Sequence, residues 1–131
     1  MYIGLDLGTS GLKGILMDDT QSVLAEASAA LAVSRPAEGW SEQSAADWIA
    51  AAETVLDALA RQVNLAGVTA IGLSGQMHGA TLLDSADEVL RPCILWNDTR
   101  SHAEAAELDD DPMFRRISGN IVFPGFTAPK L

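Results

Sequence analysis

Short apolar runs alternate with polar or glycine-containing segments along the first thirty residues. Residues 2–5 form an apolar run that ends at Asp6, and residues 12–17 form a second run, apolar apart from Lys13, that ends at Asp18. Between them, L-G-T-S-G contains two glycines that accept backbone angles closed to other residues, which suits a tight connection. Residues 23–29 follow a polar turn. The pattern predicts a hairpin and then a third strand, although the alanines of that third run also suit a helix.

Helical spacing begins after a loop at residues 33–43, which contains Pro36 and Gly39. Ser44 and Asp47 resemble a capping box with aspartate in place of the usual glutamate. Apolar residues then recur on one face of a helix, and we expect this face to pack on the core. They are Trp48, Ile49, Ala52, Val55, Leu56, Leu59, Ala60 and Val63.

The run at residues 68–74, V-T-A-I-G-L-S, has almost no polar face. Such a run is typical of a strand covered on both sides, so we expect it at the centre of a sheet. A further short strand is expected at 94–96, a helix at 100–108 and a helical piece at 113–117 in a tail rich in proline and glycine. The order predicts an α/β fold with a mixed sheet.

Composition narrows the classes of function. A chain of 131 residues with 48% hydrophobic residues is long and apolar enough for one folded domain and one core. Its net charge of -10 repels phosphates, so nucleic acid and membrane surfaces are not expected partners. Cys93 is the only cysteine, which excludes an intrachain disulfide. No apolar run approaches a membrane span or signal peptide, so we expect a cytoplasmic protein.

The segment after the first strand carries side chains suited to phosphate and metal. The amides and hydroxyls around Thr9 and Ser10 suit phosphate oxygens, and Asp6 suits Mg²⁺ held through water. Lys13 adds a positive charge. The spacing matches neither a P-loop nor a dinucleotide fingerprint, and an ordinary hairpin turn remains the alternative.

Two later segments suit a polar organic ligand. His78, in G-Q-M-H-G, follows the run at 68–74, where ligands of open α/β sheets gather. Trp96 offers a flat apolar face of the kind that stacks on sugars, with Asp98 and Arg100 beside it for hydroxyl groups. The alternatives are a surface histidine and a core tryptophan followed by a helix cap.

These segments together resemble the FGGY carbohydrate kinase family over nearly the whole chain. The blocks are, in order, DLGTSGLK, GWSEQ, GQMHG, RPCILWNDTR and GNIVFPGFTAPKL. The first resembles the phosphate-binding hairpin of the actin, hexokinase and Hsp70 superfamily, whereas QMHG and GFTAPKL are similar to pentulose kinases. The resemblance implies a ribonuclease H-like domain, with ATP bound between two such domains and a sugar deep in the cleft.

The resemblance implies roles on the nucleotide side for four residues. Asp6 matches the carboxylate that organises Mg²⁺ and the phosphates. It is therefore the expected catalytic and metal-binding residue. Thr9, Ser10 and Lys13 are expected beside the phosphates of ATP.

On the sugar side, Met77 and His78 match a pair that contacts the substrate. Trp96 and Asp98 match the wall of the cleft near the sugar. The implied reaction transfers the γ-phosphoryl group of ATP to the C5 hydroxyl of D-xylulose. Kinases for L-ribulose or glycerol, and a free-standing sugar-sensing domain without catalysis, are the alternatives.

One departure from the family pattern limits what the chain can do. In the family, the aspartate that accepts the sugar proton and the nucleotide-side domain lie downstream of the segments matched here. We therefore expect residues 1–131 to be an incomplete, N-terminal part of the substrate-side domain, inactive without its C-terminal partner segment. Uncovered apolar surface predicts self-association, and we expect a mobile segment from Pro124 onward.

Overall fold

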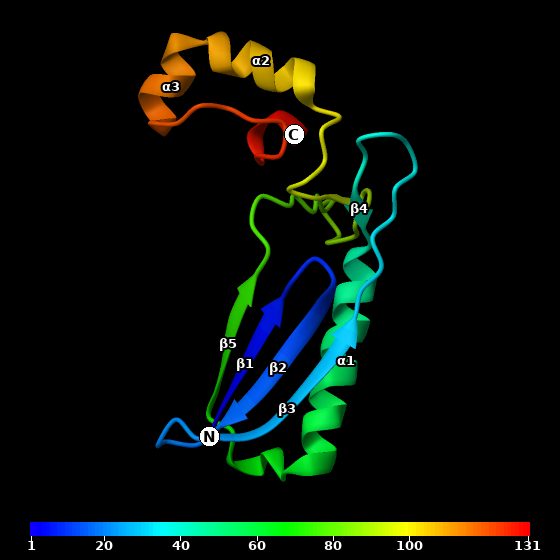
Figure 1. Ribbon diagram of the computed structural model, residues 1–131, viewed down its shortest axis with the longest axis vertical. Coiled ribbons are helices and arrows are strands. Elements are labelled where there is room, and N and C mark those ends of the chain that lie inside the picture. The colour runs from blue at the N-terminus through cyan, green and yellow to red at the C-terminus, as the bar shows by residue number, and fades with distance from the viewer. The chain divides into compact units, whose positions relative to one another are not determined.

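The computed structural model describes residues 1–131 and divides them into two compact units (Figure 1). The first unit comprises Met1–Ala32 and Ala46–Gln76, and the second comprises Val33–Ala45 and Met77–Leu131. The hydrophobic core cluster lies in the first unit. The second unit has buried residues of its own, among them Cys93, Ile94 and Leu95.

The first unit is a mixed sheet with one helix on one face (Figure 1). β1 (Tyr2–Leu7) and β2 (Gly11–Met17) form the hairpin, and β3 (Val23–Ala30) pairs antiparallel with β2. β5 (Ala70–Gly75) lies parallel to β1, so the strand order is β3-β2-β1-β5. The helix is α1 (Ala45–Gln62). The predicted strands, helix and mixed sheet are confirmed.

The helix packs closely on β2 because a glycine faces it. A Cβ atom at Gly14 would lie 2.4 Å from Cγ1 of Val55, so no larger residue fits without a shift. The helical face differs from the predicted one: Ile49 is 64% exposed, and Ala51 is buried instead. Side chains of α1 and of β1 to β3 form the core together, and they are Ile3, Leu12, Leu16, Ala25, Ala51, Val55 and Leu59.

β5 corrects the prediction made for residues 68–74. The run is a strand, but it forms the edge of the sheet, and all its residues are exposed. Ile71 is 53% and Leu73 is 80% exposed. The apolar pattern predicted cover on both faces, whereas α1 packs on β1, β2 and β3. After α1, the 3-10 turn η1 (Leu65–Gly67) leads the chain back into β5.

Short elements joined by loops build the second unit. β4 (Glu42–Gln43) pairs antiparallel with β6 (Cys93–Ile94). α2 (His102–Asp110) and α3 (Pro112–Ser118) follow, and η2 (Ala128–Lys130) is a 3-10 turn. The two predicted helices are confirmed with ends shifted by two residues or fewer.

Two details of the second unit differ from the predictions. Residues 42–43, placed in a loop by the sequence pattern, form a strand, and their partner begins at Cys93 and ends before Leu95. Both strands are defined by their pairing with each other, which a local sequence pattern does not show. Next to the pair, the N–H of Leu95 donates to the carbonyl of Ser41. None of the helices is long and apolar enough to cross a membrane.

The C-terminal segment has fixed contacts, contrary to the mobile segment expected from Pro124 onward. Pro129 and Lys130 are buried. Nη2 of Arg91 donates to the carbonyl of Lys130 over 2.7 Å. The segment is expected to be mobile because too few residues follow Pro124 to form a helix, whereas side-chain hydrogen bonds to and from Lys130 hold it instead.

Candidate functional site

The eight predicted site residues fall into two groups, one in each unit. Asp6, Thr9, Ser10 and Lys13 belong to the β1–β2 hairpin of the first unit. Met77, His78, Trp96 and Asp98 belong to the second unit.

Thr9 and Ser10 occupy the tip of the hairpin. The N–H of Gly8 donates to the carbonyl of Gly11 over 2.9 Å and closes the turn around them. A Cβ atom at Gly11 would lie 2.7 Å from the carbonyl oxygen of Ala29, so this position requires glycine. Oγ1 of Thr9 donates to Oε1 of Gln76 over 2.9 Å. The tip is thereby tied to the residue that follows β5.

Asp6 lies on the face of the sheet that carries no helix. Ile3, Leu5 and Leu7 face the core, so the alternating positions of β1 face the other way. In register, Asp6 pairs with Lys13 on β2 and Ser74 on β5.

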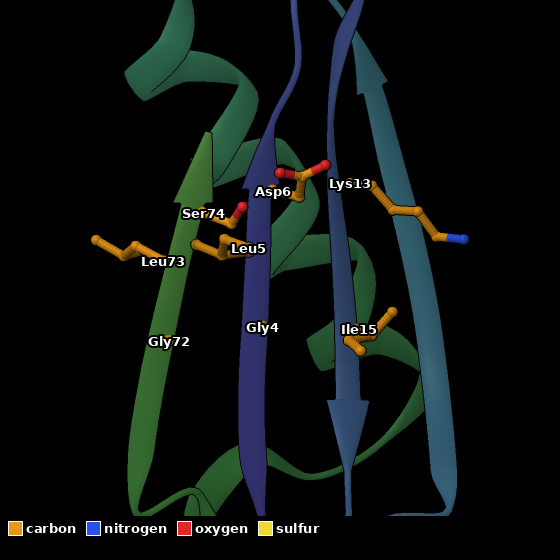
Figure 2. A pocket seen from close by; sticks show the side chains of 8 residues that line it. All are labelled: Gly4, Leu5, Asp6, Lys13, Ile15, Gly72, Leu73 and Ser74. Atoms are coloured by element: carbon orange, nitrogen blue, oxygen red, sulfur yellow. The ribbon is translucent and has the colours of Figure 1, made fainter. Parts of the chain in front are cut away.

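Figure 2 shows the residues that line a hollow beside Asp6. Its volume is about 400 Å³. Gly4 and Gly72 carry no side chain, so no side chain fills the hollow at these two positions. The lining residues are Gly4, Leu5, Asp6, Lys13, Ile15, Gly72, Leu73 and Ser74. The arrangement leaves room for a ligand beside one carboxylate.

The ammonium group of Lys13 turns toward β3. Its Nζ atom lies 2.9 Å from Oε2 of Glu26, and both side chains are exposed. The hydrogen bond from Lys13 holds the pKa of Glu26 below its ordinary value. No group of three or more histidine, cysteine, aspartate or glutamate side chains is placed to hold a metal ion. Asp6 is thus a lone carboxylate, with hydroxyl groups nearby and one lysine that already has a partner.

His78 is exposed, yet its conformation is closely defined. The N–H of Gly79 donates to the carbonyl of Met77 over 2.8 Å, and this tight turn places His78 at a φ of +63°. The imidazole ring packs on Phe126, with ring centroids 4.6 Å apart. Both Met77 and His78 present their side chains to solvent. His78 is thus an exposed histidine with a defined backbone conformation and a packed ring.

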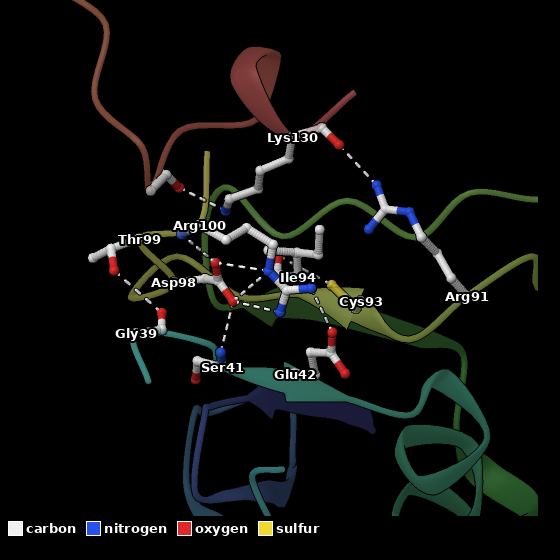
Figure 3. Close-up of polar contacts among 11 residues, drawn as sticks. Gly39, Ser41, Glu42, Arg91, Cys93, Ile94, Asp98, Thr99, Arg100 and Lys130 are labelled. Carbon is white, nitrogen blue, oxygen red and sulfur yellow. Dashed lines mark hydrogen bonds and ion pairs between the residues drawn. The ribbon is translucent and has the colours of Figure 1, made fainter. Parts of the chain in front are cut away.

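Asp98 is a buried carboxylate in the loop after β6. It accepts hydrogen bonds from the N–H of Ser41 over 2.6 Å and from Nη2 of Arg100 over 2.6 Å. Arg100 also pairs with Glu42 over 2.6 Å, and its guanidinium carbon lies 3.6 Å from the centre of the Trp40 ring. Figure 3 shows this network around the guanidinium group.

The network keeps Asp98 ionised. Burial alone would raise the pKa of Asp98, but the hydrogen bonds from Arg100 and Ser41 outweigh it and hold the pKa below its ordinary value. The Asp98 side chain is 1% exposed, and both of its oxygens accept hydrogen bonds. The structure thus places Asp98, which is expected at the cleft wall near the sugar, within this buried network. Trp96, two residues earlier, is 45% exposed, so part of its side chain faces solvent.

Sequence reasoning missed two parts of this unit. The block GWSEQ supplies Trp40 and Glu42, which hold Arg100. The only signal for a role in the sequence is that GWSEQ occurs in order with the other blocks. Lys130 was also missed. Its signal was a lysine in an apolar segment, V-F-P-G-F-T-A-P-K-L, whose ammonium group must find polar partners if it is buried.

Comparison with known proteins extends these observations. Residues 1–131 match the N-terminal domain of the FGGY family of carbohydrate kinases. The xylulose kinases of Escherichia coli (strain K12) and Klebsiella pneumoniae are 52% and 51% identical to this chain, each over 100% of it. The chain spans 27% of the length of these relatives. The crystal structure of a "xyloylose kinase" from Brucella ovis matches with a TM-score of 0.96 and 63% identity, over 98% of this chain and 28% of that one.

The structural match confirms the ribonuclease H-like fold of the actin and hexokinase superfamily, with its mixed sheet. The family match covers both units, and so includes the hairpin of Asp6 as well as the loops of His78 and Trp96. This chain belongs to the FGGY family of carbohydrate kinases.

Proposed function

We propose that this chain is the N-terminal part of the substrate-side domain of a D-xylulose kinase, which transfers the γ-phosphoryl group of ATP to the C5 hydroxyl of the sugar. The observation that carries the proposal is the identity of 51% and 52% to two xylulose kinases over the whole chain. Two exposed side chains support the proposal, because both are available to a ligand: His78, whose ring packs on Phe126, and Trp96.

Sugar binding is assigned to the second unit. The Trp96 indole offers an apolar face for the C–H groups of the sugar, and the His78 imidazole offers a hydrogen bond to a hydroxyl group. Met77 adds an exposed, adaptable thioether beside them. Asp98 acts through the loop that it holds together with Arg100, and does not itself contact the sugar.

The phosphates and Mg²⁺ are assigned to the hairpin of the first unit. Mg²⁺ is commonly held by one or two carboxylates together with substrate phosphates, so the lone carboxylate of Asp6 fits this ion. The hydroxyls of Thr9 and Ser10 fit phosphate oxygens. When bound, Mg²⁺ would neutralise charge on the phosphates. Lys13 would exchange Glu26 for a phosphate, which its exposed position allows.

In the reaction, the oxygen of the C5 hydroxyl bonds to the γ-phosphorus, the bond from that phosphorus to ADP breaks, and the proton of the C5 hydroxyl passes to a base. We assign the base and the adenosine pocket to a second, nucleotide-side domain outside residues 1–131. Phosphoryl transfer depends on positioning and electrostatic stabilisation from both sides of the site. Residues 1–131 alone are therefore expected to be inactive.

The reading frame that encodes the chain, and the activity of its whole product, test the proposal. We expect the frame to continue past Leu131 and the product to release ADP with D-xylulose in preference to L-ribulose or glycerol. A preference for either of those two would overturn the choice of sugar. A stop codon directly after Leu131, with no turnover by the product, would favour a free-standing sensing domain.

A further inference from the structure

We propose that residues 123–130 form the positioning element of the sugar site, and that Lys130 is its positioning residue, holding His78 and Trp96 where they meet the substrate. The inference rests on the proposed function in taking these two residues as sugar contacts. The positioning itself follows from contacts within the second unit, which are set out next.

The hydrogen-bond partners of the Lys130 ammonium group are carbonyl oxygens, and the charge of Asp98 also attracts it. Lys130 is 5% exposed, and its Nζ atom donates to the carbonyl of His78 over 2.9 Å and to that of Gly125 over 2.7 Å. No carboxylate lies within ion-pair distance of it. Burial lowers the pKa of Lys130, because a buried cation is costly. A methionine would fill similar space without that cost, so the distinctive contribution of the lysine is these two bonds.

Segment 123–130 holds His78 through both its backbone and its ring. A histidine at a φ of +63° occupies the left-handed region, which a residue with a Cβ atom adopts at some cost. Its carbonyl accepts from Lys130 and, over 3.4 Å, from Oγ1 of Thr127. Its ring packs on Phe126, whose own ring meets Phe123 edge-on with centroids 5.5 Å apart. The direction of the imidazole is thus set by this segment.

The same segment lies directly against the backbone of Trp96. A Cβ atom added at Gly125 would lie 2.0 Å from the carbonyl oxygen of Trp96, so only glycine allows this approach. Lys130 bonds the carbonyl of that same glycine. Figure 3 shows the Lys130 side chain extending from η2 toward the loop that carries Asp98. The Lys130 ammonium group therefore joins the loop of His78 to Gly125, the residue that lies against the backbone of Trp96.

NMR of the 131-residue chain tests the positioning without any sugar present. In Lys130→Met, we expect loss of the nuclear Overhauser effects between the His78 and Phe126 rings and shifts of the His78 imidazole and Trp96 indole signals. Lys13→Met is the matched control, since Lys13 is the only other lysine and is exposed in the first unit. It should leave all of these signals in place. Unchanged ring contacts in folded Lys130→Met would overturn the inference.

Titration with D-xylulose, followed at the Met77 and Trp96 signals, tests the consequence for binding. We expect Lys130→Met to raise the Kd roughly two- to ten-fold, the scale of one lost hydrogen bond to an uncharged group. His78→Ala is the reference. If His78→Ala weakens binding and a displaced His78 in Lys130→Met does not, the inference is wrong. If Lys130→Met displaces His78 and Trp96 but His78→Ala and Trp96→Ala bind like the parent chain, the positioning is supported, and the assignment of these residues to the sugar fails.

Phe126→Leu keeps the inference testable if Lys130→Met does not fold. This variant retains the ammonium group and its two carbonyl bonds, and removes only the ring beneath His78. We expect a shifted His78 imidazole signal and a weaker response to D-xylulose. A His78 signal and a Kd both equal to those of the parent chain would overturn the role of the segment.

Discussion

Arg100 surrounds one side of the Asp98 carboxylate, donating to it from its backbone N–H, its Nε atom and its Nη2 atom. The side chain of Asp98 is 1% exposed and that of Arg100 is 17% exposed. A charge pair so far withdrawn from water depends on both partners, because removal of one leaves the other buried without compensation.

The first prediction follows from this dependence. Arg100→Met leaves Asp98 buried without its cation and should lower the free energy of unfolding of the second unit by about 3–5 kcal/mol. Urea unfolding followed by tryptophan fluorescence measures the loss. Arg116→Met, at an exposed position of α3, is the control and should change little. If Arg100→Met lowers the free energy of unfolding by less than about 1 kcal/mol, the prediction is contradicted. Asp98 and Arg100 would then contribute no more than an exposed ion pair on the surface.

The second prediction concerns acid. The pKa of Asp98 is lower in the folded chain than the ordinary value of 3.8, so its contribution is complete above that value and is lost as the pH falls through the folded pKa. Asp98→Asn lacks this contribution. The difference in unfolding free energy between the two proteins should be constant above about pH 5 and shrink below about pH 4. Equal slopes for both proteins down to pH 2 would contradict the assignment.

The third prediction uses two glycines of the sheet as a matched pair. Gly14→Ala places a Cβ atom 2.4 Å from Val55 and should destabilise the first unit by about 1–3 kcal/mol through overpacking. At Gly72 no atom lies within 4 Å of an added Cβ, so Gly72→Ala should be nearly neutral. Thermal unfolding of the two variants measures the difference. Similar effects at both positions would show that α1 does not rest on β2 as described.

Local periodicity predicted the helices and strands well, because each depends on neighbours along the chain. It could not predict that residues 70–75 form a sheet edge, since an apolar run looks the same at an edge as at the centre. Nor could it place Asp98, whose backbone partner Ser41 lies 57 residues away. The bond from Lys130 to His78 spans 52 residues. The sequence marks the blocks GQMHG and GFTAPKL separately, and the structure shows that they are in contact.

The fourth prediction concerns the exposed edge of the sheet. β5 is an apolar edge strand without charge or proline, the kind that pairs with other chains. We expect the chain to self-associate through it, more strongly at high salt, because screening weakens repulsion between copies with a net charge of -10. Leu73→Lys should reduce the associated fraction in size exclusion with light scattering. Ile49→Lys, at an apolar residue that is 64% exposed on α1, should not. A monomer at every concentration and salt would contradict the prediction.

Steady-state kinetics of the complete kinase test the assignment of the sugar site most directly. His78→Ala should raise the KM for D-xylulose roughly two- to ten-fold, because it removes one hydrogen bond to a sugar hydroxyl, and leave the KM for ATP unchanged. Asp6→Ala should instead lower kcat, since that residue is assigned to Mg²⁺ and the phosphates. An unchanged KM for D-xylulose in His78→Ala, or an equal rise in both KM values, would contradict the assignment of the second unit to the sugar.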